Sequence, residues 1–259
     1  MTAAEFLEAH TLPFTLVFVR MGSIFVLTPV FNIAELPRRV KGWTAAALAL
    51  VVYPFTAPFL PPVAGFGPVY LLHLFQSALV GILIGLIVQV YYTSFLMAGE
   101  FYSLQLGFGI VNVLDPLSAT SIPILGQLKS LFAIIVFILI GGHRMVIEAL
   151  IYSFKAVPVF GIAAARPLAA VMVGSLREMF IIAFQIAAPM MGTIFLVELV
   201  LGILSKMAPQ MNIMVAGFQI KIAVGLIILL MIIPAIYTVV DNTFYHSFLV
   251  IRAVLRSMA

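Results

Sequence analysis

Apolar residues in this chain form long continuous runs rather than an alternating pattern. Such runs predict helices, because a helix that crosses a bilayer needs about 20 mainly apolar residues and satisfies its backbone hydrogen bonds internally. The pattern therefore predicts an all-α, polytopic integral membrane protein of about six kinked hydrophobic helices arranged as hairpins. We place the spans at residues 13–31, 42–60, 69–97, 128–147, 172–206 and 213–240.

Helix-breaking residues separate or bend the predicted spans. A proline and glycine cluster at residues 58–68 predicts a tight turn between the second and third spans, and residues 208–212 predict another between the last two. Proline inside an apolar run removes a backbone hydrogen bond, so we expect the fifth span to kink at Pro189. The other prolines inside apolar runs are Pro29, Pro54 and Pro234.

Composition excludes a water-soluble globule. Apolar residues make up 64% of the 259 residues and charged residues only 8%, whereas charged residues form about 25% of an average soluble domain. The absence of cysteine excludes disulfides and thiolate metal sites. The net charge of +4 is scattered rather than gathered in a basic patch, so nucleic acid is not an expected partner.

The basic residues give conflicting evidence on topology. Three of them make the 31–42 loop the densest basic segment, which places this loop in the cytoplasm by the positive-inside rule. Six spans would then put both termini outside, yet Arg252 and Arg256 favour a cytoplasmic C-terminal tail. At least one segment therefore does not cross the membrane simply, and we expect it to be residues 98–128. The three basic residues of the loop are Arg38, Arg39 and Lys41.

Residues 98–128 are too rich in glycine and proline to lie against lipid and too apolar for an ordinary loop. Irregular backbone at membrane depth occurs only where protein buries it or where it lines a water-filled cavity. Two interpretations stay open, a loop outside the membrane and a pore element. The spacing Gly107-x-Gly109 lacks a third glycine, because Asn112 stands at that position, so no dinucleotide-binding fingerprint is present.

Charges inside apolar runs are the candidate functional residues, because an unpaired charge at membrane depth is costly. Glu198 and Lys221 are equidistant from the 208–212 turn, so an antiparallel hairpin places both about 17 Å from it by the rise per residue. Three arrangements stay open: a pair within the hairpin, a polar seam shared with neighbouring chains, and two side chains that line separate crevices. Equal depth does not decide between them, because it does not fix the direction in which each side chain points around its helix axis.

Other positions carry weaker signals. Arg20 in the first span, and Arg177 with Glu178 in the fifth, lie nearer the span ends, where long side chains can reach water. Gly81 and Gly85 form a small-residue motif that predicts close helix contact.

Recognisable catalytic patterns are missing from the sequence. The four histidines are far apart, and the chain has no zinc-protease motif, no nucleophile elbow and no phosphate-binding loop. We expect no enzyme, no metal site and no cofactor. A secondary transporter of a small solute or ion stays open, since broken helices and midplane charges are typical of such proteins. The lack of an evident internal repeat favours a subunit of a larger membrane assembly.

Several segments resemble the FliR family of flagellar biosynthesis proteins and its virulence-system counterparts. The most specific is the C-terminal signature LVLGILSKMAPQMN at residues 199–212, followed by GFQIK at 217–221. The matches keep the family's order and cover nearly the whole chain. The remaining matching parts are Arg20 and residues 28–31, 37–41 and 99–116.

The resemblance implies a subunit of the type III export gate. This gate is a helical assembly of FliP, FliQ and FliR in the flagellar basal body of the bacterial inner membrane, through which unfolded flagellar proteins leave the cytoplasm. Residues 1–170 would be a FliP-like helical part and residues 171–259 a FliQ-like hairpin and tail. The implied partners are FliP-like, FliQ-like and FlhB-like subunits, unfolded export substrates and membrane lipid. Much of this assembly lies outward of the membrane plane, which would explain the conflict in topology.

The resemblance also implies that residues 98–128 project into the channel as a plug. Apolar side chains there would seal a constriction against ions by dewetting. The implied plug residues are Gly107, Phe108, Gly109, Ile110, Val111, Val113, Leu114, Asp115 and Pro116. Those implied as subunit contacts or buried charges are Arg20, Glu100, Glu178, Glu198, Lys206, Pro209, Gln210 and Lys221.

Overall fold

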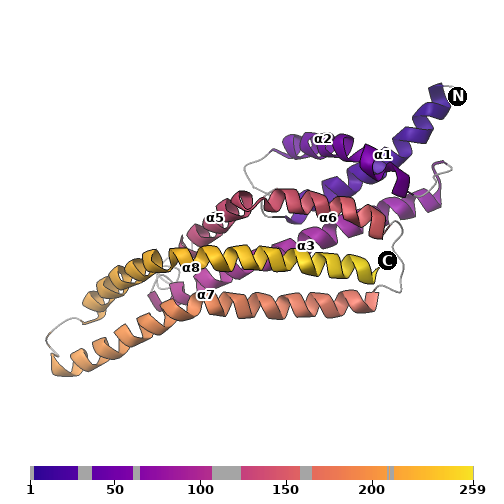
Figure 1. Cartoon of the computed structure of the whole chain (residues 1–259). Helices are drawn as coiled ribbons and strands as arrows, with labels where there is room; N and C mark the ends of the chain where they lie inside the picture. Colours follow the sequence, from indigo (N-terminus) through magenta and orange to yellow (C-terminus); the bar gives the residue numbers. More distant parts are fainter. Residues whose placement is uncertain are drawn as a thin grey trace. The chain divides into compact units, whose positions relative to one another are not determined.

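The described part of the chain is almost entirely helical (Figure 1). A computed structural model describes residues 3–28, 37–60, 65–106, 124–157, 165–208, 210 and 213–258. Within these ranges no strand occurs, which confirms the prediction of an all-α protein. The helices are α1 (Ala3–Leu27), α2 (Arg38–Thr56), the 3-10 helix η1 (Ala57–Phe59), α3 (Pro68–Leu106), α5 (Ile124–Leu139), α6 (Gly142–Ala156), α7 (Ala165–Met207) and α8 (Ile213–Ser257).

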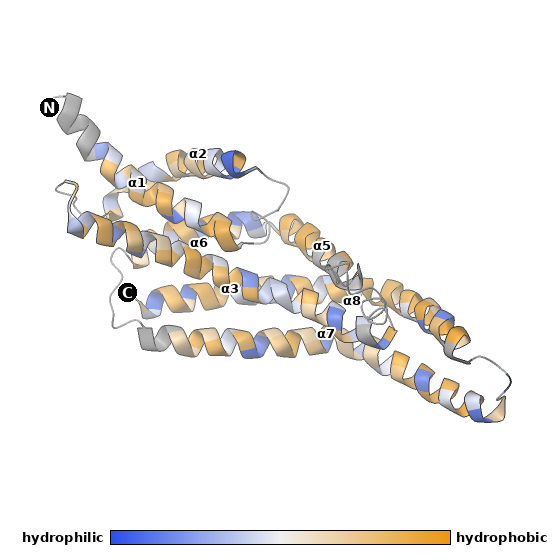
Figure 2. Cartoon of the chain, turned by 180° about the vertical axis from the view of Figure 1, so that it is seen from behind, coloured by the Kyte–Doolittle hydropathy of each residue, from blue (hydrophilic) through white to orange (hydrophobic). Residues whose placement is uncertain are grey.

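Most of these helices are long and apolar enough to cross a membrane. Among the described residues five helices meet this criterion, namely α1, α2 with η1, α3, α7 and α8, and a sixth span results if α5 and α6 count as one broken span. Figure 2 shows hydrophobic colour along most of each long helix, with only isolated hydrophilic positions. The prediction of a polytopic membrane protein of about six apolar helices is thereby confirmed.

The fourth predicted span, residues 128–147, is wrong as a single helix. The segments on either side of the break, in α5 and α6, differ in direction by 68°. Gly141 at the break has φ +74°, the left-handed region that glycine adopts without a side-chain penalty. Its carbonyl accepts hydrogen bonds from the amides of Arg144 and Met145, which begins α6. Hydropathy alone misses this break, because a glycine fits inside an apolar run.

The segment predicted to be irregular, residues 98–128, is partly helical. Its first part continues α3 as far as Leu106, and its last part lies in α5, which begins at Ile124. The intervening residues 107–123, with all the implied plug residues, lie outside the described ranges.

The 31–42 loop and the C-terminal tail also differ from the prediction. The three basic residues assigned to the 31–42 loop lie in the first turn of α2 instead, after Pro37. The C-terminal tail is helical, because α8 continues beyond the predicted end at residue 240 as far as Ser257. Helix α8 extends further because residues 241–257 keep buried apolar positions at helical spacing, among them Phe244 and Ile251.

Other boundaries follow the helix-breaking residues. Helix α2 ends at Thr56 and α3 begins at Pro68, on either side of the predicted 58–68 turn. Helix α7 ends at Met207 and α8 begins at Ile213, which confirms the predicted turn between the last two spans. Helix α7 remains one helix with Pro189 inside it, and its ribbon in Figure 1 continues without a break. The kink at Pro189 stays a prediction.

The chain divides into two compact units, and α3, α7 and α8 each contribute to both. The predicted division between residues 170 and 171 stays a prediction beside this interleaved arrangement. Unit 1 consists of Met1–Tyr91, Ile138–Leu176 and Phe244–Ala259, and unit 2 of Tyr92–Phe137 and Arg177–Thr243.

Unit 1 is built on the packing of α1 against α2 and the first part of α3. Leu12 and Leu16 of α1 form a buried cluster with Tyr70 of α3, and the Tyr70 hydroxyl hydrogen-bonds to Thr15. Helix α1 also packs along α2, where the rings of Phe14 and Tyr53 meet edge to face, with centroids 5.9 Å apart. These contacts hold α1, the helix that carries Arg20, against α2 and α3.

Unit 2 contains the hairpin formed by α7 and α8, which lie side by side in Figures 1 and 2. Buried positions on α7 recur every three or four residues and mark its inner face. The end of α3 packs on α8, because a Cβ added to Gly225 would lie only 2.7 Å from a δ-methyl group of Leu106. The inner positions of α7 are Met179, Ala183, Ile186, Ala187, Met190 and Ile194.

Candidate functional site

Arg20 joins three helices in the interior of unit 1. Its side chain is only 3% exposed. Its Nε donates to Ser77 Oγ of α3 at 3.2 Å, and Nη1 donates to Ser153 Oγ of α6 at 3.1 Å. Both Nη atoms lie 3.4 Å from the carbonyl oxygen of Val157, directly after α6. The guanidinium carbon lies 4.0 Å from the centroid of the Phe154 ring.

The partners of Arg20 are oriented by their own helices. Ser77 donates its hydroxyl proton to the Leu16 carbonyl at 2.8 Å, and Ser153 donates to the Leu150 carbonyl at 2.6 Å. Each hydroxyl oxygen therefore directs its lone pairs toward the guanidinium. Among the described residues, no carboxylate forms an ion pair with Arg20. The charge is instead stabilised by hydroxyl, carbonyl and aromatic groups.

The expectation that the Arg20 side chain reaches water is wrong, because the side chain is buried. Tight packing of α3 against the last part of α1, from residue 20 onward, encloses the Arg20 side chain. The predicted small-residue motif is the cause, because Gly81 faces the Arg20 carbonyl oxygen and the Ser23 side chain, and Gly85 faces Leu27 and Thr28. The motif is therefore occupied within the chain, by α1.

The structure brings Glu198 and Lys221 together across the α7–α8 hairpin. Lys221 Nζ donates to Glu198 Oε1 at 2.6 Å. The Glu198 side chain is 38% exposed and the Lys221 side chain 23%, so the pair lies at the surface of unit 2 rather than in its core. Of the alternatives left open by the sequence, this contact favours a pair within the hairpin. The two side chains lie at the same depth and also point toward each other around their helix axes.

The surface around this ion pair is apolar. Bulky side chains on both helices are exposed next to it in the sequence, including Phe195 and Leu199 on α7 and Phe218 and Ile220 on α8. Within an apolar stretch of 18 residues in each helix, only 28% of the α7 residues and 17% of the α8 residues are buried inside the chain. The pair is therefore an isolated polar feature on a surface that water does not favour.

Exchanging the two charges tests the ion pair directly. We expect Glu198→Ala or Lys221→Ala alone to destabilise the hairpin by about 1–3 kcal/mol, because each leaves one charge without its partner in apolar surroundings. The double variant Glu198→Lys with Lys221→Glu should recover most of this loss. Protein level and protease resistance in membranes measure the effect, and Arg177→Ala, at an exposed position on α7, is the matched control. Equal damage in the exchanged and single variants would contradict an ion pair between α7 and α8.

The other predicted site residues are dispersed. Glu100 is exposed near the end of α3, Glu178 is half-buried on α7, and Lys206 and Gln210 are exposed around the hairpin turn. Arg177 and Glu178 lie in the first part of the apolar span of α7, Ala169–Met207, although the helix itself begins earlier, at Ala165. Pro209 lies outside the described residues.

Sequence reasoning missed the partners of Arg20. Ser77 and Ser153 are small polar residues inside apolar helices, and each could have been identified as a hydrogen-bonding position for that reason alone. The carbonyl of Val157 could not, because every residue has one. In the described part of the chain, no group of three His, Asp or Glu side chains could hold a metal ion.

These features define a class of protein: a helical, multi-span membrane protein whose polar residues join helices. Comparison of the sequence identifies the family. The profile of the bacterial export proteins, family 1, matches residues 11–247. The chain belongs to this family, and the resemblance noted above is confirmed.

The curated relatives are similar over most of their length. The flagellar biosynthetic protein FliR of Bacillus subtilis is 35% identical over 237 residues, covering 89% of this chain and 90% of the relative. FliR of Escherichia coli K12 is 29% identical over 89% of this chain and 87% of the relative. FliR of Aquifex aeolicus is 28% identical over 99% of this chain and 97% of the relative. The chain is thus a component of flagellar protein export, and this favours export over the secondary transporter left open by the sequence.

Proposed function

We propose that this chain is a core subunit of the flagellar type III export gate, located in the bacterial inner membrane at the basal body. It would form part of the channel wall and its closure for unfolded flagellar proteins. The single observation that carries this proposal is the exposed apolar surface of the α7–α8 hairpin, which is longer than a membrane is thick.

The lengths of the two helices support a protein environment. Their apolar spans, Ala169–Met207 and Val215–Ser257, contain 39 and 43 residues. At 1.5 Å per residue these spans are about 58 and 64 Å long, whereas the hydrocarbon core of a bilayer is about 30 Å thick. Tilting accommodates part of this difference. The remaining apolar surface needs cover from other protein chains, because water would otherwise contact it.

The exposed ion pair supports the same conclusion. Glu198 and Lys221 retain exposed fractions of 38% and 23% on this surface. Charged atoms that face lipid are costly, whereas polar groups of a neighbouring protein can complete their hydrogen bonds. FliQ-like hairpins and FliP-like subunits are the proposed neighbours, with an FlhB-like subunit beside the gate. Glu100, Lys206 and Gln210 are exposed and suited to such contacts.

The closure is proposed for residues 107–116, which lie outside the described residues. Two glycines there, Gly107 and Gly109, would let the backbone fold across a pore, and the apolar residues between them and Pro116 would exclude water and ions. The chain would act passively, with the energy for export coming from other components of the apparatus.

Deleting residues 107–116 tests the proposal. Leu106 is kept, because it is buried and packs on Gly225. We expect a several-fold rise in sodium or proton leakage across membranes that contain the assembled variant, because the apolar constriction is lost. Leakage is measured in energised cells, and affinity purification of the tagged chain checks that FliP-like and FliQ-like subunits accompany it.

The two measurements separate the parts of the proposal. Purification of a stable chain without such subunits would contradict the export gate itself. Assembled complexes with normal leakage and growth would contradict the plug while leaving the wall in place. Shuffling the sequence of residues 110–114, which keeps their composition, is the matched control and should leave the seal largely intact.

A further inference from the structure

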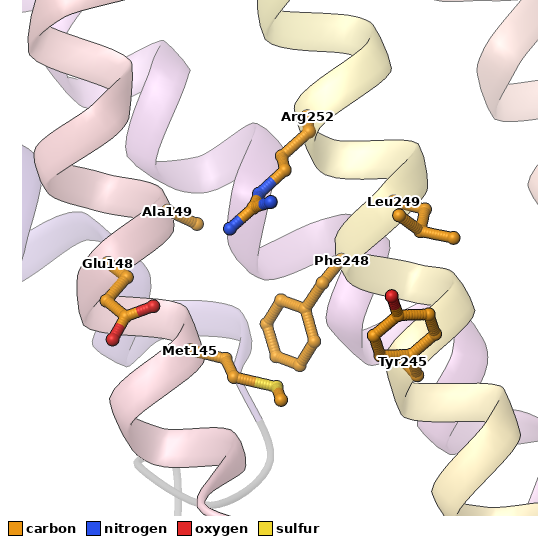
Figure 3. Close-up of a pocket in the computed structure, with 7 residues that line it drawn as sticks. All are labelled: Met145, Glu148, Ala149, Tyr245, Phe248, Leu249 and Arg252. Carbon is orange, nitrogen blue, oxygen red and sulfur yellow. The ribbon is translucent and has the colours of Figure 1, made fainter.

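A cavity of about 110 Å³ lies between α6 and the last part of α8 in unit 1. Figure 3 shows Arg252 extending from α8 toward Ala149 of α6, with the Phe248 ring and the Met145 side chain between the two helices. None of these residues takes part in the Arg20 cluster or in the α7–α8 ion pair. The lining residues are Met145, Glu148, Ala149, Tyr245, Phe248, Leu249 and Arg252.

The charges that face the cavity leave one cation without a counter-charge. Glu148 accepts a hydrogen bond from Arg144 Nε at 2.9 Å and forms an exposed ion pair with it. Arg252 is exposed, and no carboxylate of the described residues forms an ion pair with it. Arg256 follows one helical turn later and is exposed as well. Counted together, Glu148, its partner Arg144 and Arg252 carry one excess positive charge, and Arg252 offers a planar fork of donors that suits an oxyanion such as phosphate.

The remaining walls are apolar and aromatic. Phe248 and Ala149 are buried, while Tyr245 and Leu249 are exposed beside them. Such walls suit hydrocarbon, and the tyrosine hydroxyl offers a donor at the edge of the apolar surface. The site thus combines a phosphate-binding group with a surface for an acyl chain.

The position along α8 points to the same ligand. The apolar span of α8 ends at Ser257, directly after Arg252 and Arg256. Basic pockets between membrane helices bind anionic lipid head groups. Because the chain is a membrane protein, bilayer phospholipid is also the ligand present at the highest local concentration.

We propose that this cavity binds an anionic phospholipid of the bilayer. Arg252 holds the phosphate, and one acyl chain leaves the cavity along Phe248 and Met145. The cavity is too small for a whole lipid, so only the phosphate and the adjoining atoms enter it. Zwitterionic lipids bind less tightly, because their head groups carry no net negative charge to balance the single excess positive charge of the site.

Photo-crosslinking tests this proposal on the full-length chain. The tagged chain is purified with the subunits that accompany it and placed in phosphatidylcholine nanodiscs that contain a photo-activatable phosphatidylglycerol. We expect adducts on the segments 145–149 and 245–252, located by mass spectrometry. Arg252→Gln should lower their yield about tenfold, which corresponds to 1.4 kcal/mol. Arg252→Lys should retain most of the yield, and it shows whether loss in the glutamine variant reflects charge rather than folding.

Each alternative ligand has its own outcome. Arg39→Gln, at an exposed arginine of α2 away from the cavity, should leave the yield unchanged. Unchanged labelling in Arg252→Gln would overturn the proposal. Equal labelling by a photo-activatable phosphatidylcholine would overturn the preference for anionic lipid. Loss of labelling in excess inorganic phosphate would show a site for free anions instead and would likewise overturn the assignment to lipid.

Discussion

Replacing Arg20 with alanine is expected to destabilise unit 1 by about 3–5 kcal/mol. The change removes the bonds to Ser77 and Ser153, leaves the buried Val157 carbonyl without its donors, and opens a cavity beside Phe154. Because these partners lie on α3 and α6, losing the Arg20 side chain weakens the contacts of α1 with both helices. Thermal unfolding of the purified chain with its accompanying subunits, and its steady-state level in membranes, measure the effect.

Two further variants show which part of Arg20 matters. Arg20→Lys keeps the charge but loses the planar fork, so we expect it to recover less than half of the stability. Arg20→Met fills the space without hydrogen bonds, and stability equal to the wild type would show that the bonds contribute nothing net. Arg39→Ala, at an exposed arginine of α2, is the matched control and should change stability by less than about 0.5 kcal/mol.

Introducing a single methyl group at Gly81 is the second large expected effect. A Cβ there would lie 2.5 Å from the Arg20 carbonyl oxygen and would overlap the Ser23 side chain. Because a helix carbonyl cannot move aside, α1 and α3 must separate, and we expect Gly81→Ala to destabilise the protein by about 2–3 kcal/mol. Unfolding in detergent or protease resistance in membranes reports the change.

Graded substitutions make this test specific. At Gly85 the nearest atoms to an added Cβ lie 3.3 Å away, so Gly85→Ala should cost clearly less than Gly81→Ala. Gly174 has no atom within 4 Å of an added Cβ, and Gly174→Ala should be neutral or slightly stabilising, because alanine favours the helix. Adding Ser23→Ala to Gly81→Ala should rescue it only in part, since the carbonyl contact remains. Equal effects at all three glycines would contradict the close approach of α1 and α3.

The apolar pattern predicts most of the architecture without a structure. Membrane spans can be found locally in a sequence, because nearly every residue of a span must be apolar to lie against lipid or apolar protein. The apolar runs therefore locate α1, α2, α3, α7 and α8. The ends of helices are less predictable where the only helix-breaking residue is a single glycine in an apolar run. The break before α6 depends on one glycine with φ +74°, and a glycine in an apolar run does not distinguish a bend from a continuous helix.

The candidate site is only partly predictable for a similar reason. Equal depth of Glu198 and Lys221 follows from their distances to the turn, and the 2.6 Å contact adds the azimuth that the sequence leaves open. Its position in the chain suggests that Arg20 has access to water, whereas α3 and α6 enclose its side chain in the structure. Its partners lie 57 and 133 residues away along the chain, beyond the range of any helical periodicity.

The sequence by itself determined that this protein is helical, lies in a membrane and belongs to an export family, because hydropathy and motif identity are properties of neighbouring residues. The tertiary structure alone decided which polar groups meet. Those contacts depend on the rotation of each helix about its axis and on the approach of α1 to α3, and both are set by packing between residues distant in the chain.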